Sequence, residues 1–135
     1  MKAITMIKAI SASTAAFFAF SVSAPAQAPD LALLNGLQKG EWTLKSRGSN
    51  DGGQKVCLGD PAILLQIQHS GTSCSRYVIQ DRPDSVRVSY KCGSSDHGVT
   101  TIKRESSGLV QIQSQGIKGN APFSFNVEGR RTGAC

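Results

Sequence analysis

The stretch from Cys74 to Cys92 constrains the fold more than any other, because its pattern is that of a hairpin with a cysteine at each outer end. Two runs of β-branched and aromatic residues, 77–79 and 86–90, flank the cluster Asp81-Arg82-Pro83-Asp84. Proline has a fixed φ that suits a tight reversal, so the cluster predicts a turn between two antiparallel strands. The other strands are expected to extend this hairpin into a sheet.

Short segments in which apolar and polar residues alternate recur along the rest of the chain, with turn residues between them. Such a series is typical of an antiparallel meander. Turns or loops are expected at 93–98 and 116–120. Six or seven strands suffice for a curved sheet or incomplete barrel, so the sequence predicts an all-β or mainly β fold. The expected strands outside the first arm of the hairpin are 41–47, 54–58, 85–92, 99–104, 109–115 and 123–128.

Two short helices are expected beside the sheet. Asp30 precedes the apolar residues 31–34 and is a suitable N-cap for one or two turns. Asp60 can cap a second helix that runs to Ile67, since Pro61 at the first helical position needs no hydrogen-bond partner. The apolar residues of this second helix are expected to cover one face of the sheet.

The first residues have the features of a secretory signal peptide. Lys2 and Lys8 precede an apolar stretch at 10–22, and an alanine-rich segment follows. The apolar stretch falls short of the roughly 20 residues that cross a bilayer, which disfavours a membrane anchor. We therefore predict a signal peptide over 1–26, cleaved after Ala26, and one domain over 27–135. Cleavage after Ala28 is disfavoured because a proline would follow the cut. The predicted location is the periplasm or the exterior of the cell.

All four cysteines follow the predicted signal peptide, and an even number in an exported chain indicates two disulfides. A domain of this size has a modest core and gains from covalent braces. Four cysteines allow three pairings. We expect Cys57 to pair with Cys74 and Cys92 with Cys135, because a bridge between the facing strands of the hairpin demands a special geometry.

The combination of Gly40-Glu41-Trp42, the four spaced cysteines and the ending at 129–135 resembles a family of small exported bacterial proteins, domain of unknown function number 3617. The resemblance implies an envelope location and a disulfide-bearing β-domain, and it implies no activity. A weaker likeness is to lipocalin-type barrels and related protease inhibitors. It implies that Arg130 or Arg131 lies over the Trp42 indole, in a cation–π contact worth about 0.5 to 2 kcal/mol. Trp42 is expected to anchor the core.

No catalytic, metal or cofactor site is expected. The two histidines, His69 and His97, fall in Gly/Ser-rich segments and are expected to be solvated, and no serine has the setting of a nucleophile. The cysteines lack the spacing of a redox pair. Asp96 with the histidines lacks the close ligand spacing of a metal site.

Basic residues predominate on the polar sides of the expected strands. The formal charge of +6 becomes +4 once Lys2 and Lys8 are removed. Aligned strands would gather these side chains into a basic face that attracts anionic glycans, lipid headgroups or acidic proteins, although a scattered solvated surface is the alternative. Nucleic acid is disfavoured because stacking aromatics are scarce. The residues concerned are Lys45, Arg47, Arg87, Lys91, Lys103 and Arg104.

These features together predict a non-enzymatic binding or structural role in the bacterial envelope. The alternative is a calycin-like carrier of a small apolar ligand, or a protease inhibitor. A pocket opposite Trp42, lined by Tyr77, Tyr90, Phe123 and Phe125, would favour the carrier. A filled core would favour the envelope-binding role.

Overall fold

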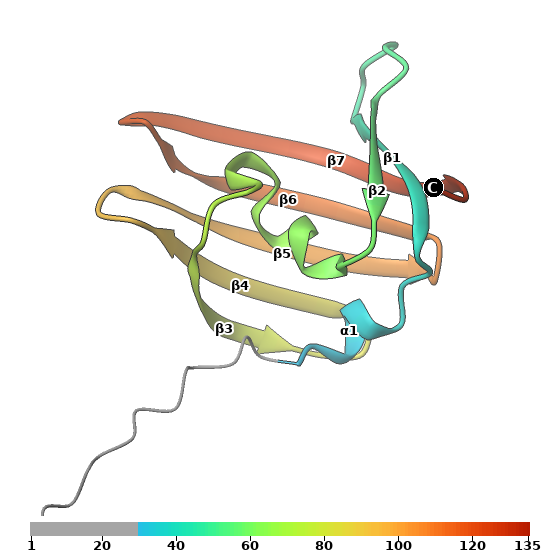
Figure 1. The fold of residues 1–135 in the computed structure, drawn as a ribbon, viewed down its shortest axis with the longest axis horizontal. Helices are drawn as coiled ribbons and strands as arrows, with labels where there is room; N and C mark the ends of the chain where they lie inside the picture. The colour runs from blue at the N-terminus through green and yellow to red at the C-terminus, as the bar shows by residue number, and fades with distance from the viewer. Residues whose placement is uncertain (1–29) are drawn as a thin grey trace, which may run out of the picture.

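Seven antiparallel strands form one sheet in the order β2-β1-β7-β6-β5-β4-β3, as seen in the computed structural model, which describes residues 30–135 (Figure 1). The mainly β fold predicted from the alternating segments is confirmed, and the sheet is not closed into a barrel. The predicted signal peptide over 1–26 and its cleavage site lie outside the described residues. The strands are β1 (Gly40–Ser46), β2 (Gln54–Leu58), β3 (Ser75–Asp81), β4 (Ser85–Cys92), β5 (Asp96–Ser106), β6 (Leu109–Lys118) and β7 (Ala121–Gly133).

The path of the chain explains why the sheet stays open. Strands β3 to β7 follow one another as a meander, and β1 pairs with β7, so the first and last strands lie side by side. Strands β2 and β3 are consecutive in the chain but form opposite edges of the sheet. The 3₁₀-helix η1 (Pro61–His69) connects them and crosses one face of the sheet (Figure 1). We call the face under η1 the inner face and the opposite one the outer face.

The inner face is packed. On β4, Val86, Val88 and Tyr90 are buried while the residues between them are not, as the alternation predicts. Trp42 is fully buried, and its indole N–H donates to the carbonyl oxygen of Gln38 at 2.9 Å. The core cluster around this indole also contains leucines from η1 and from α1 (Ala32–Asn35). The predicted core role of Trp42 is therefore confirmed, and the helices fill the space above the sheet.

The two helices occupy the predicted positions with local differences. Asp60 caps η1 as predicted, with its carboxylate accepting the Ala62 N–H at 2.9 Å. The helix is of the 3₁₀ type and is interrupted at Gln66, whose φ and ψ are −141° and 45°. The prediction that Asp30 caps α1 is wrong, because its carboxylate accepts the side-chain amide of Asn35 instead.

Two expected loops are shorter than predicted because the long strands continue to pair through them. Strand β5 already begins at Asp96, and β6 runs on to Lys118. Gly98 pairs with Gly116 in this stretch. A Cβ atom at Gly116 would overlap the carbonyl oxygen of His97, so glycine here permits a close backbone approach instead of a turn.

The disulfides join Cys57 to Cys135 and Cys74 to Cys92, so the expected pairing was wrong. The strand order gives the reason. Cys57 lies in β2 and Cys74 directly precedes β3, and these two strands are opposite edges of the sheet. Strand β3 pairs with β4, which ends at Cys92, so Cys74 and Cys92 lie close together. Glu41 on β1 pairs with Cys57 on one side and with Gly133 on the other, which brings the chain end within reach of β2.

Candidate functional site

The outer face carries a continuous row of polar side chains that runs across the strands. Arg87 on β4 pairs with Thr101 on β5, Thr101 with Gln113 on β6, and Gln113 with Asn126 on β7. The backbone N–H of Arg47, just after β1, donates to the carbonyl oxygen of Asn126 at 3.1 Å. An arginine therefore stands at each end of a row of uncharged amide and hydroxyl groups.

Two adjoining hollows follow this row, with volumes of about 700 and 340 Å³. They share Thr101, Gln113 and Asn126, so they form one surface, which we call the polar groove. Further amide and hydroxyl side chains border it, namely those of Gln80, Ser85, Gln111, Gln115 and Ser124.

The polar groove has a positive charge. Arg82 and Lys103 join the two arginines of the row, against the carboxylates of Asp84 and Glu105, and Arg104 also lines the groove but has its guanidinium close to Gly36. The ion pairs found among residues 30–135 are Lys55–Glu41 and Arg130–Glu128, and His69 Nε2 lies 3.5 Å from a carboxylate oxygen of Asp96. None of them uses a cation of the groove. Four cations thus face two carboxylates on a solvated surface, and they can interact with an anionic ligand.

Most of the predicted basic face is present on the outer side of the sheet. Lys45, Arg87, Lys91 and Lys103 lie at outer-face positions, opposite Glu128, Thr101, His97 and Gln111 respectively. Arg104 differs, because it lies opposite the buried Val110 and its guanidinium is close to Gly36 beside α1. Glu128 is occupied by Gln111 and Arg130, whose hydrogen bonds lower the pKa of its carboxyl, with Gln111 contributing most.

The four aromatic residues predicted to face a ligand are not all brought together. Tyr90 is buried on the inner face, where its ring and that of Phe123 both lie edge-on to His69, and Phe123 stacks on Phe125 with ring centroids 6.0 Å apart. Tyr77 lies on the outer side of the edge strand β3 and is 72% exposed. Two leucines of η1, Leu64 and Leu65, are buried in the same core cluster as the Trp42 indole.

His69 is not a solvated loop residue, contrary to expectation. It ends η1 and is only 3% exposed. Its Nε2 lies 3.1 Å from the Ile117 carbonyl oxygen and 3.5 Å from a carboxylate oxygen of Asp96. A carbonyl only accepts, so Nε2 donates, and Nδ1 accepts from the Tyr90 hydroxyl at 3.0 Å. Both ring nitrogens are therefore used in holding η1 to β4 and β6. His97 is exposed as predicted, with Nδ1 bonded to the Ser95 carbonyl oxygen.

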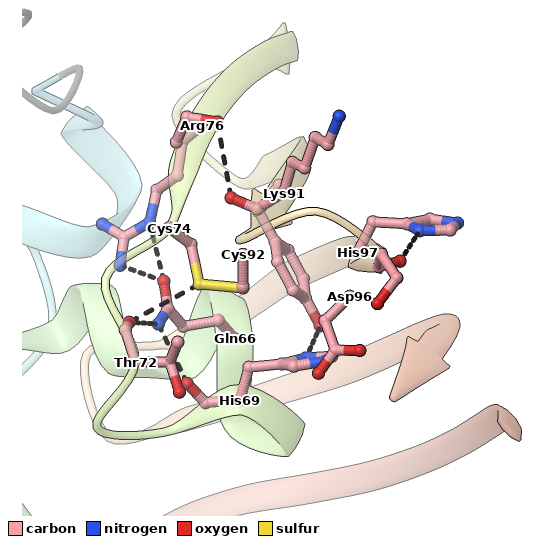
Figure 2. Close-up of a disulfide and its surroundings, with 12 residues drawn as sticks. Gln66, His69, Thr72, Cys74, Arg76, Lys91, Cys92, Asp96 and His97 are labelled. Carbon is pink, nitrogen blue, oxygen red and sulfur yellow. Dashed lines mark hydrogen bonds and ion pairs between the residues drawn. A yellow bond between two sulfur atoms is a disulfide. The ribbon is translucent and has the colours of Figure 1, made fainter. Parts of the chain in front are cut away.

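A second polar network holds the end of η1 against β3, beside the Cys74–Cys92 bridge (Figure 2). Arg76 donates from Nε and Nη2 to the side-chain oxygen of Gln66, at 3.2 and 2.7 Å. The Gln66 amide nitrogen donates to the carbonyl oxygens of His69 and Thr72, at 3.1 and 2.8 Å. The only sign of this network in the sequence is one glutamine within the apolar run 63–67.

The two C-terminal arginines have different surroundings. Arg131 lies opposite Trp42 in the register and donates from Nε to the carbonyl oxygen of Lys39 at 2.9 Å. Arg130 lies opposite Thr43 and pairs with Glu128. Arg131 is therefore the one that shares a side of the sheet with Trp42, and the cation–π contact implied by the lipocalin likeness stays a prediction.

Within residues 30–135 no group of three or more metal-ligating side chains comes together, and no helix is both long and apolar enough to cross a membrane. Two disulfides fit an oxidising compartment such as the periplasm or the cell exterior. A scan against protein-family models and searches of curated proteins and of solved structures gave no match. The resemblance to the family of unknown function stays a prediction.

Proposed function

We propose that this protein binds an anionic polysaccharide of the cell envelope along the polar groove and catalyses no reaction on it. The observation that carries this proposal is the row from Arg87 to Arg47, with amide and hydroxyl groups between the two arginines. Guanidinium groups bind carboxylates and phosphates with two parallel hydrogen bonds. Amide and hydroxyl side chains both donate and accept, as the hydroxyls of sugars do.

The length of the row favours a polymer over a small ligand. Adjacent strands lie about 4.8 Å apart, so four steps from β4 to the end of β1 span about 19 Å. A chain of several sugar units can contact both arginines, whereas a single small anion reaches only one. The lining of the polar groove is dominated by polar side chains, which disfavours a lipid tail as the ligand.

The packing of the inner face supports this role over that of a carrier with a ligand opposite Trp42. Leu64 and Leu65 of η1 are buried in the same cluster as the indole. His69 uses both ring nitrogens in structural hydrogen bonds, which disfavours it as a general base. We place the protein in the periplasm or outside the cell, where the two disulfides are stable.

Binding to polygalacturonate, a uronic acid polymer, tests the proposal, with neutral dextran as the control. The affinity of the oxidised protein for polygalacturonate, measured by calorimetry, should fall steeply between 50 and 300 mM salt, because screening shortens the reach of charges to below about 10 Å above 0.1 M. Dextran should bind far more weakly. Equal binding of the two polymers, binding that ignores salt, or no binding of polygalacturonate would refute the proposal.

A charge-matched pair of variants locates the binding surface. Arg47→Gln with Arg87→Gln removes the two ends of the row, and Lys39→Gln with Lys118→Gln removes the same charge from exposed sites outside the groove. Each exposed cation contributes up to about 1 kcal/mol, so the groove variant should bind roughly 5- to 25-fold more weakly. Equal losses in both variants would show that net charge, and not the groove, governs binding.

A further inference from the structure

A separate cleft of about 500 Å³ opens at one end of the inner face, between the loop that joins β1 to β2 and the second half of η1. Its apolar walls come from three elements: Leu44 on β1, Ile67 on η1, and Phe125 and Val127 on β7. Its volume lies in the range of small-molecule sites. The cleft therefore lies on the inner side of β1 and β7, whereas the row of the polar groove runs along the outer side of β4 to β7.

The apolar walls of the cleft are incompletely covered by the protein. Ile67, Phe125 and Val127 are half-buried at the margin of the core, and Phe123 continues the apolar surface by stacking on Phe125. The helix is interrupted at Gln66, directly before Ile67. An apolar group placed in the cleft would remove these side chains from water.

The rim of the cleft is polar and contains one carboxylate, that of Asp51. Its Oδ1 accepts the Gly53 N–H at 3.1 Å. Hydrogen bonds with Ser49 and with Gly53 lower the pKa of this carboxyl, and the bond with Ser49 contributes most. Asp51 is therefore ionised at neutral pH. Gly53 has a φ of 74°, which favours glycine and holds this loop conformation over the cleft.

The other charges and polar groups near the rim define which head group fits. The charge of Lys45 contributes least to the lowered pKa of Asp51. Lys45 occupies an outer-face position opposite Glu128. The side chains of Ser46, Gln54 and Gln68 complete the rim without adding charge. An anionic head group would be repelled by the carboxylate, whereas an ammonium group would be attracted to it.

We propose that this cleft binds an amphiphilic cation, that is, an aliphatic chain with an ammonium head group. The chain lies against Ile67, Phe125 and Val127, and the ammonium lies at Asp51. This site differs from the polar groove in the sign of its charge and in its rim residues, although Phe125 and Val127 border both.

The test compares three probes of equal chain length: hexyltrimethylammonium, hexanol and hexanoate. Binding is followed by the chemical shifts of the Ile67 and Val127 methyl groups. The cation should bind most tightly and hexanoate most weakly. Asp51→Asn should weaken binding of the cation about two- to fivefold, as expected for a partly exposed ion pair, and leave hexanol binding unchanged.

Control variants distinguish binding in the cleft from binding at the polar groove. Arg47→Gln with Arg87→Gln should leave binding of the cation unchanged, so a failure of the polysaccharide proposal leaves this test intact. Asp51 is exposed, so its substitution does not threaten folding. Equal binding of the cation and hexanoate, an unchanged affinity in Asp51→Asn, or no methyl shift with any probe would overturn the proposal.

Discussion

Replacing Gln66 with leucine should destabilise the fold, although leucine is the more apolar residue and the site is only 6% exposed. The change removes the acceptor of two Arg76 bonds and the donor to the carbonyls of His69 and Thr72. A hydrogen bond to a charged group contributes about 1.5 to 3 kcal/mol, and a buried carbonyl left unpaired costs about 1 to 3 kcal/mol. Thr72 is exposed and can turn to water, and leucine recovers some packing. We expect a net loss of about 2 to 4 kcal/mol.

Denaturant unfolding with both disulfides oxidised measures this loss through the shift in midpoint at constant slope. Arg76→Met in combination with Gln66→Leu completes a double-mutant cycle. Because the second change removes the unpaired guanidinium, the double variant should be more stable than the sum of the single changes predicts, by about 1 to 2 kcal/mol. Gln68→Leu, two residues further on, should change stability by less than about 0.5 kcal/mol. A loss below about 1 kcal/mol for Gln66→Leu, or strictly additive changes, would refute the reasoning.

Three further predictions concern the covalent braces, a glycine and pH. Serine replacement of both cysteines should lower the free energy of unfolding by about 4.5 kcal/mol for the Cys57–Cys135 bridge and by about 3.2 kcal/mol for the Cys74–Cys92 bridge. The difference arises because the bridges restrict the entropy of the unfolded chain over separations of 78 and 18 residues. The reverse order of losses in chemical unfolding would contradict this. Gly116→Ala should lower the melting temperature by several degrees, since its Cβ overlaps a carbonyl oxygen, and Gly59→Ala, with open space around it, should not. The hydrogen bond from Lys55 is the main cause that lowers the pKa of Glu41 from 4.5. The ionised Glu41 carboxylate therefore stabilises the fold above pH 4.5, and this contribution is lost as the pH falls through the lowered pKa. Acid titration of Lys55→Gln should show a smaller loss of stability below pH 4.5 than the unchanged protein, and an identical curve would contradict the assignment.

The sequence correctly predicts which side chains of a strand face the core, because the alternation of a strand is a local property. Val86 and Val88 point into the core and Arg87 points to the outer face, as their alternation requires. Strand ends are predicted less well. The stretch at 93–98 contains turn residues, yet β5 begins at Asp96, since Asp96 pairs with Cys92 on β4 and His97 pairs with Ile117 on β6.

Features that depend on strand order are not accessible from local patterns. The partners of His69 come from β4 and from the end of β6, so nothing near His69 in the sequence marks its burial. The disulfide pairing depends in the same way on β1 lying between β2 and β7. The row from Arg87 to Arg47 requires the register of five strands, although each of its basic residues is recognisable as a polar-side residue in its own strand.

The crossing of η1 determines which face of the sheet is covered. In a closed barrel, β2 and β3 would pair and leave an interior for a ligand. Here the chain between these strands places Leu64 and Leu65 on the inner face, so the interior becomes core and a cleft stays open at its end. The part of the chain that the structure describes places no helix over the outer face, and the exposed side chains there lie outside the core cluster. Substitutions there can therefore alter binding with little cost in stability, which is the property expected of a recognition surface.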